Sequence, residues 1–376
     1  MKQEWQHKIL VFGFMLLLCL PAFRMLIFNK EEVLPGENRK SASFPKFSIL
    51  YQTNPMASAN QYFHDINEYC SDHYGFRSEL LTIFRFCKVS LFSVNPFPDK
   101  VVQGTNNWYF LGNSYSDVIK ESKGITFFSE SQLGIIENNI NTIDEDCRKR
   151  GIKLYIAIAP NKHTVYGQYL PIIKSQHPTK LEQVITRMNY HHLSIIDLKR
   201  DFSRYSDKRL FYLHDTHWNA FGSFLGYRTL MDYIVRDSPE LKVLSLDDFK
   251  LDTITSDRND LTGMLFLKLT EDKVVMEPKY VCNARQEKHK LSVPDHYTRN
   301  KNDYEIRFVN TSRPYKVMIF RDSFCEAMIP FIRDSFGESV FIWSGYERRL
   351  IDIEKPDLII CEVVEREIDT FDNIHL

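Results

Sequence analysis

The stretch Lys316-Val317-Met318-Ile319-Phe320, followed directly by Arg321-Asp322-Ser323-Phe324, decides the fold of this chain. Its first part is an apolar run of strand length, and residues 324–336 continue with helical spacing. A short polar turn between a buried strand and a helix is typical of a parallel sheet, with the turn at the carboxyl end of the strand. We therefore expect Ser323 at a strand-to-helix turn on that edge of the sheet.

The same alternation recurs on both sides of this stretch. Strands are predicted over residues 153–159, 193–198, 339–343 and 357–363, and helices over 132–150, 219–236 and a short segment that ends at 351. Strands this apolar, separated by helices, imply a parallel sheet that is covered on both faces. The fold class we predict is α/β, a three-layer αβα sandwich with a mostly parallel sheet.

The N-terminal segment, residues 1–30, contains an apolar run without charge from Ile9 to Phe23. With its continuation, the run reaches the roughly 20 residues needed to cross a bilayer. Lys2 and Lys8 precede it as in a signal peptide, but the sequence around Pro21 offers no good cleavage site. We expect an uncleaved anchor, and a cleaved export signal is the alternative. Either one places the bulk of the chain outside the cytoplasm, and the anchor predicts a single-pass protein of the inner membrane with a periplasmic domain.

Two further segments complete the predicted organisation. Residues 31–98 start with a polar, proline-containing stretch and continue with helical spacing that is interrupted near residues 74–77. This pattern predicts a tether followed by short helices. Residues 99–376 are predicted to form the main, catalytic domain, with an insertion at about 244–315 where short strand-like pieces and many polar residues break the α/β rhythm.

Composition excludes several classes of function. The 376 residues are 43% hydrophobic, which is enough for a substantial core. The 48 basic and 49 acidic residues are interspersed, so no basic face for nucleic acid is expected. The seven cysteines contain no C-x-x-C pair, which argues against a zinc ribbon and against a dense disulfide scaffold. Whether any cysteines pair is left open by their spacing.

A second motif, Asp215-Thr216-His217-Trp218, precedes Ser323 in the chain. This motif supplies an acid and an imidazole two residues apart. If a serine lies beside them in the fold, the three groups suffice to make its hydroxyl nucleophilic at neutral pH. Ser323 is the predicted nucleophile, His217 the general base and Asp215 the acid that orients the imidazole. Backbone N–H groups at the start of the helix after Ser323 are expected to stabilise an oxyanion. The predicted chemistry is acyl transfer.

An alternative interpretation of His214, Asp215 and His217 is a metal site. No second cluster of ligands follows in the sequence, so we predict no metal and no cofactor. His214 is then expected to be an ordinary loop residue.

The order strand, D-x-H-W-N, helix, insertion, strand, D-S-F, helix resembles the SGNH-hydrolase-like domain of the alginate O-acetyltransferase proteins, which act on exopolysaccharides outside the cytoplasm. The resemblance covers most of the chain. Further matches are Glu37-Asn38-Arg39, Asp72-His73-Tyr74-Gly75-Phe76-Arg77, residues 104–111, Pro160-Asn161-Lys162 with Tyr166, Leu170-Pro171 and Glu365-Arg366. Relative to ordinary SGNH hydrolases the motif order is circularly permuted, because the Asp and the His precede the Ser.

This resemblance implies the same roles for Ser323, His217 and Asp215. It places Gly345 near the glycine that supplies an oxyanion N–H, and Arg366 near the usual asparagine.

Two departures from the family pattern accompany these matches. Arg321 stands where the family motif commonly has glycine, and no asparagine occupies the third oxyanion position. Arg321 either crowds the serine turn or binds an anionic sugar. Lys162 and Tyr166 either bind substrate or cap the end of the strand before them.

The resemblance implies an O-acetyltransferase in which Ser323 accepts an acetyl group and passes it to a hydroxyl of a polysaccharide. It also implies a membrane-embedded acyltransferase partner that supplies the acetyl group. A carbohydrate acetylesterase would use the same residues, with water in place of the sugar hydroxyl. A noncatalytic polysaccharide-binding assembly factor is the third hypothesis, and Arg321 is the residue that favours it.

Overall fold

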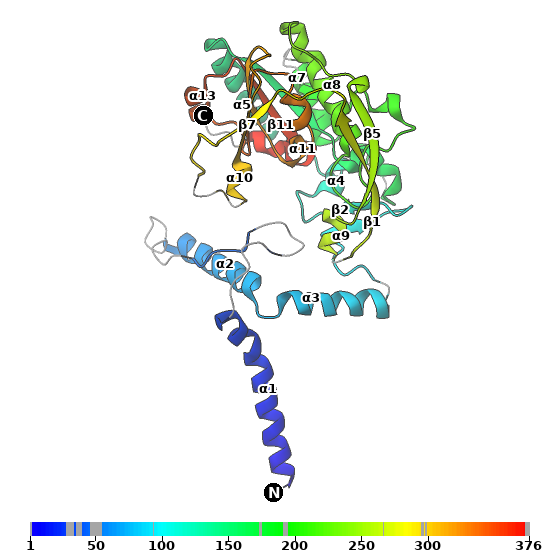
Figure 1. Cartoon of the computed structure of the whole chain (residues 1–376). Helices are drawn as coiled ribbons and strands as arrows, with labels where there is room; N and C mark the ends of the chain where they lie inside the picture. The colour runs from blue at the N-terminus through cyan, green and yellow to red at the C-terminus, as the bar shows by residue number, and fades with distance from the viewer. Residues whose placement is uncertain are drawn as a thin grey trace. The chain divides into compact units, whose positions relative to one another are not determined.

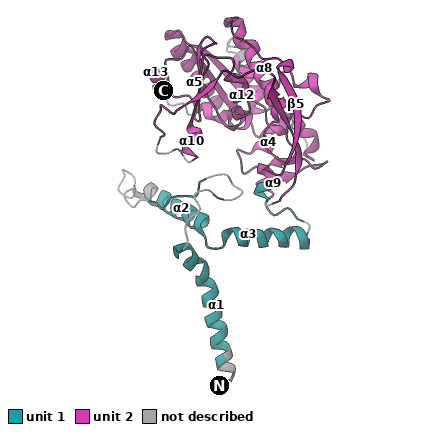
Figure 2. Ribbon diagram, viewed as in Figure 1, with its two compact units in different colours: residues 1–96, 263–267 teal, residues 97–262, 268–376 magenta. Residues whose placement is uncertain are grey.

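The computed structural model of the chain describes residues 2–27, 34, 40–45, 55–92, 94–172, 175–190, 195–265, 267–294, 297 and 299–372. The chain divides into two compact units, Met1–Pro96 with Gly263–Leu267 and Phe97–Thr262 with Lys268–Leu376 (Figure 2). The motif Glu37-Asn38-Arg39 and most of the predicted tether lie outside the described residues.

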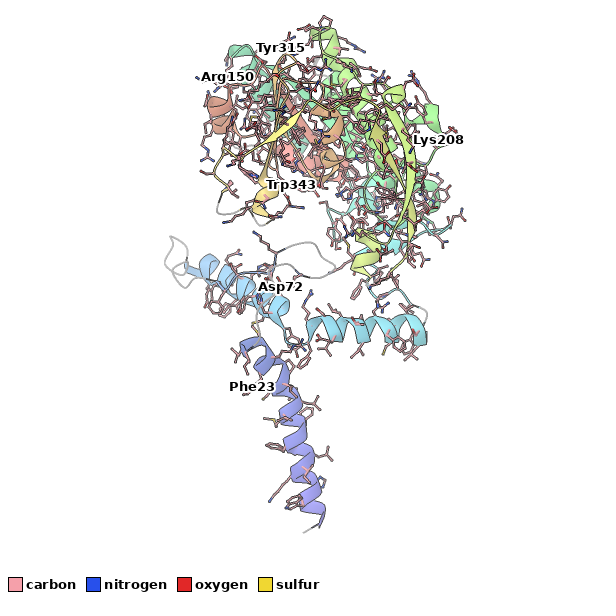
Figure 3. The ribbon with its side chains drawn as sticks, viewed as in Figure 1. Phe23, Asp72, Arg150, Lys208, Tyr315 and Trp343 are labelled. Atoms are coloured by element: carbon pink, nitrogen blue, oxygen red, sulfur yellow. The ribbon has the colours of Figure 1, made fainter. Side chains whose placement is uncertain are left out.

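The first unit is built mainly from helices. They are α1 (Lys2–Ile27), α2 (Pro55–His73) and α3 (Arg77–Phe86), which continues into the π-helical turn η2 (Cys87–Leu91) (Figure 1). The predicted interruption near residues 74–77 is confirmed, and Phe76 has a left-handed backbone there. Apolar side chains of α1 project into solvent, as Phe23 does (Figure 3). Over residues 7–27 this helix is long and apolar enough to cross a membrane.

A mostly parallel sheet forms the centre of the second unit. In the described residues its strands are β3 (Lys153–Ala159), β4 (Ile195–Asp197), β7 (Arg285–Glu287), β8 (Glu305–Val309), β9 (Lys316–Phe320), β10 (Glu338–Ile342) and β11 (Leu358–Val364). Their order is β4-β3-β11-β9-β10-β8-β7, with parallel pairing from β4 to β10 and antiparallel pairing of β8 with β10 and β7. The predicted parallel sheet is confirmed. The first residues of the strand predicted over 193–198 lie outside the described residues.

Helices cover both faces of this sheet. One face packs against α8 (Ala220–Asp237), α11 (Ser323–Glu326) and α12 (Ile329–Ile332), and the other against α5 (Glu130–Lys149), α7 (Lys180–Tyr190) and α13 (Arg348–Glu354). Side chains of β3 alternate between the two cores, because successive residues of a strand point to opposite faces. Tyr155 and Ala157 belong to the core with α8, and Ile156 and Ile158 to the core with α5. The predicted three layers are therefore present.

Part of the predicted insertion extends the central sheet. Residues 244–315 contain the hairpin of β5 (Phe249–Ser256) and β6 (Glu271–Pro278), with α9 (Asp260–Met264) between them. They also contain β7 and β8, which add the antiparallel edge. The remaining described elements are β1 (Val101–Gln103), β2 (Tyr109–Leu111), α4 (Val118–Ser122), α6 (Lys162–Tyr166), η3 (Gly167–Tyr169), η4 (Phe202–Tyr205), η5 (Leu246–Asp248), α10 (Lys301–Tyr304) and η6 (Glu365–Asp372).

The single helix predicted over residues 324–336 is wrong in its length. The structure has two short helices, α11 and α12, in its place. Pro330 lies in the first turn of α12, where its missing N–H group needs no partner. The same proline could not donate to a carbonyl of α11, so a continuous helix would lose a hydrogen bond and clash with the proline ring.

A buried charge cluster joins the antiparallel edge to the parallel strands. The Arg307 side chain on β8 has no exposed surface and forms ion pairs with Glu305 at 2.9 Å, with Glu354 at 2.6 Å, and with Glu338. The Nζ atom of Lys316 also lies 2.6 Å from Glu354. Two cations therefore pair with three carboxylates, and removal of Arg307 takes away the ion pair of the buried Glu305 carboxylate.

Arg307→Leu is expected to lower the free energy of unfolding by about 3–5 kcal/mol, since buried carboxylates would lose their guanidinium partner. Denaturant titration of the full chain in detergent measures this change. Arg349→Leu is the matched control, because the Arg349 side chain is 71% exposed, and its effect should stay within about 0.5 kcal/mol. Equal stabilities of the two variants would contradict a structural role for the cluster.

Candidate active site

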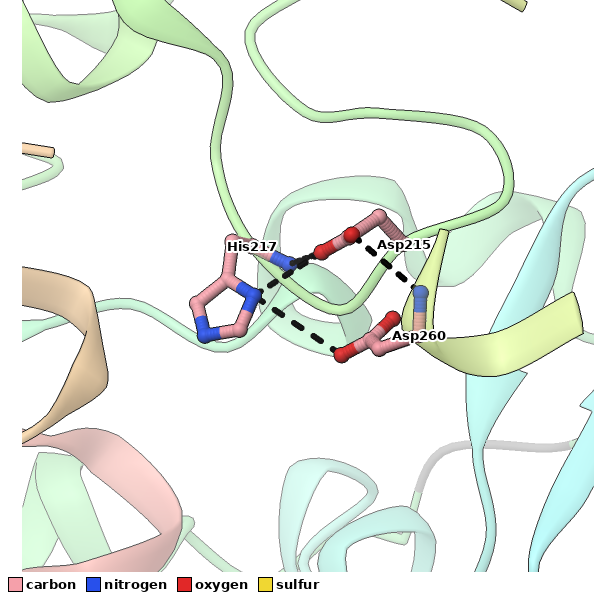
Figure 4. A group of neighbouring side chains, drawn as sticks. All are labelled: Asp215, His217 and Asp260. Carbon is pink, nitrogen blue, oxygen red and sulfur yellow. Dashed lines mark hydrogen bonds and ion pairs between the residues drawn. The ribbon is translucent and has the colours of Figure 1, made fainter. Parts of the chain in front are cut away.

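The structure brings the predicted acid Asp215, base His217 and nucleophile Ser323 together at the carboxyl end of β9. We call these three residues the relay. The Oδ1 atom of Asp215 lies 2.8 Å from His217 Nδ1 and also accepts a hydrogen bond from the His217 backbone N–H (Figure 4). On the other side of the ring, Nε2 lies 3.0 Å from the Oγ atom of Ser323. Acid, imidazole and hydroxyl are thus connected in the order that a proton relay requires.

Each residue around His217 has a separate task in the motif. The indole N–H of Trp218 donates to the backbone carbonyl of Phe324 at 3.0 Å, which ties the motif to the serine turn. Asn219 caps α8 by accepting a hydrogen bond from the Gly222 N–H at 2.9 Å. The sequence D-T-H-W-N therefore places the base, holds the turn that carries Ser323, and starts the next helix.

The serine turn is fixed to the neighbouring strand β11. Ser323 begins α11 directly after β9, as predicted, and Asp322 is the N-cap. The two carboxylate oxygens of Asp322 accept hydrogen bonds from Phe324 N–H at 2.7 Å and Val364 N–H at 2.6 Å. The Phe324 N–H is therefore already engaged and is a poor oxyanion donor. With four residues, α11 also has too few aligned peptide groups for a strong dipole.

Electrostatic coupling favours the charged pair of imidazolium and carboxylate. Burial alone would lower the pKa of His217, but the hydrogen bond with Asp215 and the charges of Asp215 and Asp260 outweigh it and raise this pKa above the usual value for histidine. Burial would raise the pKa of Asp215, yet its bonds to His217 hold that pKa far below its usual range. A proton that His217 takes from Ser323 is therefore stabilised on the imidazole.

Asp260 is a site residue that sequence reasoning missed. Its Oδ2 atom lies 3.7 Å from His217 Nδ1, and its Oδ1 atom accepts a hydrogen bond from the Thr216 N–H at 2.7 Å. It lies in the predicted insertion, at the end of the polar run Ser256-Asp257-Arg258-Asn259-Asp260, where no motif spacing links it to His217. Only the path of the chain between β5 and β6 brings it to the relay.

Among the described residues, Asp215, His217 and Asp260 also have the spacing of three metal ligands. Both imidazole nitrogens of His217 already have hydrogen-bonding partners in the relay. A metal ion bound to Nδ1 would displace Asp215 from that nitrogen, so the relay and a metal site exclude each other.

Lys162 is fully buried and holds the loop that carries Asp215. Its Nζ atom donates to the backbone carbonyls of Tyr109 at 2.6 Å, Leu213 at 2.8 Å and Asp215 at 3.0 Å. Burial lowers the pKa of Lys162 to about 7, although the charges of Asp260 and Asp215 act against this shift. All three donor positions of its ammonium group are used, which favours a structural role over direct contact with substrate.

Tyr166 and Arg321 also use their polar groups inside the protein. The hydroxyl oxygen of Tyr166 accepts a hydrogen bond from the Leu210 N–H at 2.9 Å. The Arg321 side chain has no exposed surface; its guanidinium lies 4.1 Å from the centre of the Trp343 ring and donates to the Asp303 carbonyl. These contacts favour a packing role for Arg321 over sugar binding.

Gly345 and Arg366 lie in segments that follow β10 and β11. Gly345 is exposed, and an added Cβ atom would meet nothing within 4 Å. The Arg366 guanidinium lies 5.3 Å from the centre of the Phe324 ring and donates to the Asn161 side chain at 3.3 Å. Its charge acts to lower the pKa of His217. Arg366 is therefore a cation within electrostatic reach of the relay.

Comparison with known proteins agrees with this fold. The sequence profile of a family described as "SGNH hydrolase-like domain, acetyltransferase AlgX" matches residues 101–315. The chain belongs to this family. The matched residues include Asp215, His217 and Asp260 but end before Ser323, so the case for this nucleophile depends on its geometry. No curated protein matches the chain.

The solved structures that resemble this chain are only distantly similar to it in sequence. PatB1 of Bacillus cereus has a TM-score of 0.55 at 15% identity, over 73% of this chain and 99% of that chain. The structure of PatB1 with a sulfonyl adduct has a TM-score of 0.53 at 15% identity, over 71% and 97%. The O-acetyltransferase domain of Pseudomonas putida AlgJ gives 0.41 at 16% identity, over 72% and 92%. The two PatB1 comparisons show the fold, and with the family match they confirm the predicted SGNH-like α/β class.

Lys162→Met should lower the free energy of unfolding by about 2–4 kcal/mol, because three buried carbonyls would lose their donor. Thermal and denaturant unfolding of the full chain measure this effect. Lys250→Met, at an exposed position of β5, is the control and should change stability by less than about 0.5 kcal/mol. If Lys162 served substrate binding instead, its variant would keep full stability and only KM would rise.

Proposed function

We propose that this protein is an extracytoplasmic O-acetyltransferase that moves an acetyl group through a serine acyl-enzyme to hydroxyls of an exopolysaccharide. The observation that carries the proposal is the connected relay, with His217 Nδ1 at 2.8 Å from Asp215 and Nε2 at 3.0 Å from Ser323 Oγ. Membership of an SGNH hydrolase-like acetyltransferase family supports the reaction class.

In the first half-reaction Ser323 Oγ attacks the carbonyl carbon of an acetyl donor, and His217 Nε2 takes the hydroxyl proton. The tetrahedral intermediate carries a negative oxygen, for which Gly345 N–H and the Arg366 guanidinium are the proposed stabilising groups. When the intermediate collapses, the bond to the donor's leaving group breaks, and His217 returns its proton to that group. The acetyl group is then an ester on Ser323.

The second half-reaction runs the same steps in reverse order. A sugar hydroxyl attacks the carbonyl carbon of acetyl-Ser323 and gives its proton to His217 Nε2. Collapse of this second intermediate breaks the bond to Ser323 Oγ, which recovers the proton from the imidazolium. Asp215 keeps the imidazole in the orientation in which Nδ1 carries a hydrogen, so Nε2 is the nitrogen that exchanges protons.

The cellular setting is proposed from α1 and from the family. A helix of this length and mean hydropathy, 2.3 over its apolar part, fits a single-pass anchor in the inner membrane with the second unit on the periplasmic side. A membrane-embedded acyltransferase is the proposed source of acetyl groups, and a polysaccharide is the proposed acceptor. An anchored enzyme would meet both at the membrane surface.

Hydrolysis of the acyl-enzyme is the competing outcome, since water and a sugar hydroxyl can react with acetyl-Ser323 in the same way. The binding-factor hypothesis is weaker. The Arg321 side chain that favoured it packs on the Trp343 ring and donates hydrogen bonds to backbone carbonyls.

Ser323→Ala is expected to reduce release of product from a chromogenic acetyl ester by a factor on the order of 10³ or more, since Ser323 carries the hydroxyl that contacts His217 Nε2 in the described part of the chain. Ser203→Ala, which changes an exposed serine of η4, is the control and should retain full turnover. Mass spectrometry after addition of oligosaccharide acceptors separates transfer from hydrolysis. Full turnover by the Ser323 variant would refute the proposed nucleophile, and free acetate without acetylated sugar would identify an esterase.

A further inference from the structure

Asp260 faces the relay from the side opposite Ser323. Figure 4 shows its carboxylate beside that of Asp215, with both directed at the same imidazole. Its Oδ2 atom is 3.7 Å from His217 Nδ1, and its backbone N–H donates to the Oδ2 atom of Asp215 at 3.3 Å. Asp260 therefore contacts both the acid and the imidazole of the base.

We propose that Asp260 is a second carboxylate of the relay, a positioning residue that fixes Asp215 and stabilises the positive charge on His217. This inference rests on the proposed function. It goes beyond it because the proposed relay of Asp215, His217 and Ser323 assigns no role to Asp260.

Two of its contacts fix geometry rather than charge. The Oδ1 atom accepts hydrogen bonds from Thr216 N–H at 2.7 Å and from its neighbour's N–H, that of Leu261, at 2.6 Å. Thr216 lies between the acid and the base, so this bond sets the distance between the two side chains. An asparagine oxygen would accept the same hydrogen bonds, so these contacts alone do not require an acid.

The position of the second oxygen, Oδ2, favours a negatively charged side chain at residue 260. Within the described part of the chain, the ion pair of Asp260 is formed with His217, and its side chain is 17% exposed. Two carboxylates beside one imidazole repel each other, and a protonated imidazole offsets this repulsion by attracting both. Burial, and then the charge of Asp215, raise the pKa of Asp260 to about 6, while the charge of His217 lowers it. The ionised form of Asp260 and the protonated form of His217 therefore stabilise each other.

Other charged groups also act on the residues of this site. The Lys162 ammonium donates to the Asp215 carbonyl, and the charge of Lys273 on β6 acts to lower the pKa of Asp215. Glu271 of β6 acts on Lys162, and Arg366 acts on His217. Among the carboxylates that the structure describes, Asp215 and Asp260 approach His217 Nδ1 within 4 Å. The effect of Asp260 on His217 is therefore separable by mutation from the general field of the site.

The test compares the full-length Asp260→Asn variant with the unchanged chain, both in detergent, across a range of pH. Removing the second negative charge should lower the pKa of His217, so the acid limb of kcat should move to lower pH by roughly half a unit or more. At the optimum, kcat should fall by about tenfold, since the imidazolium formed during transfer loses one of its two counterions. KM should stay within about twofold of its original value, because Asp260 lies behind the imidazole. Asp257→Asn, an exposed acid of the same segment, is the matched control and should change neither quantity.

A readout without turnover keeps this inference distinct from the proposed function. Histidine labelled with ¹³C at Cε1 reports the titration of His217 by NMR, with His217→Gln assigning the signal. The midpoint should fall in Asp260→Asn even if Ser323→Ala were to show that Ser323 is not the nucleophile. Asp260→Ser, which keeps an acceptor for the Thr216 N–H, serves the same purpose should the asparagine variant not fold.

Three results would overturn the inference. The first is an unchanged His217 titration in whichever of the two variants folds. The second is an equal loss of kcat with no movement of the acid limb, which would indicate a structural role only. The third is loss of activity in a chelator with recovery on adding Zn²⁺ or Ca²⁺, because Asp260 would then be a metal ligand.

Discussion

The hydrogen bond between His217 and Ser323 joins loops that are 106 residues apart in sequence, so everything else in the site depends on holding two loops in register at one edge of the sheet. The strands supply the first constraint, since β9 pairs in parallel with β11 and β10. Side chains supply the second: Trp218 binds the Phe324 carbonyl and Asp322 binds the Val364 N–H. A shift of about 1 Å at either loop would break the relay.

Buried charged groups perform much of this positioning. Lys162 donates to three carbonyls around the Asp215 loop, and Glu271 accepts hydrogen bonds from the N–H groups of Leu213 and His214 at 2.7 and 3.1 Å. Asp260 does the same for Thr216. In a partly desolvated site such groups are held in place before the reaction begins, so little reorganisation accompanies charge movement. The segment between α8 and β9 therefore supports the site as well as extending the sheet.

Sequence reasoning succeeded where the signal was local. The bounds of β3 and β9 follow from apolar runs that end in polar turns. The relay residues could be named because acid, imidazole and serine have fixed chemical roles. The short polar turn between the apolar run over 316–320 and the helical spacing from residue 324 also located Ser323.

What could not be predicted depends on distant contacts. Asp260 and Glu271 lie in a polar segment with no motif, and only the path of the β5–β6 hairpin brings them to residues 213–217. Arg321 could be read as a sugar-binding cation because its partner, Trp343, lies after the next strand. Lys162 gives the same sequence signal whether it binds substrate or backbone carbonyls. Such roles follow from which buried groups need a partner, and that information is three-dimensional.

The most direct measurement is to trap the covalent intermediate. The full chain is mixed with an activated acetyl ester, quenched in acid within the first turnover, and digested for peptide mass spectrometry. One acetyl group on Ser323, forming no more slowly than product is released, is the predicted result. Steady release of product with no acetyl group on Ser323, or with the acetyl group on another side chain, would contradict a relay that activates this hydroxyl.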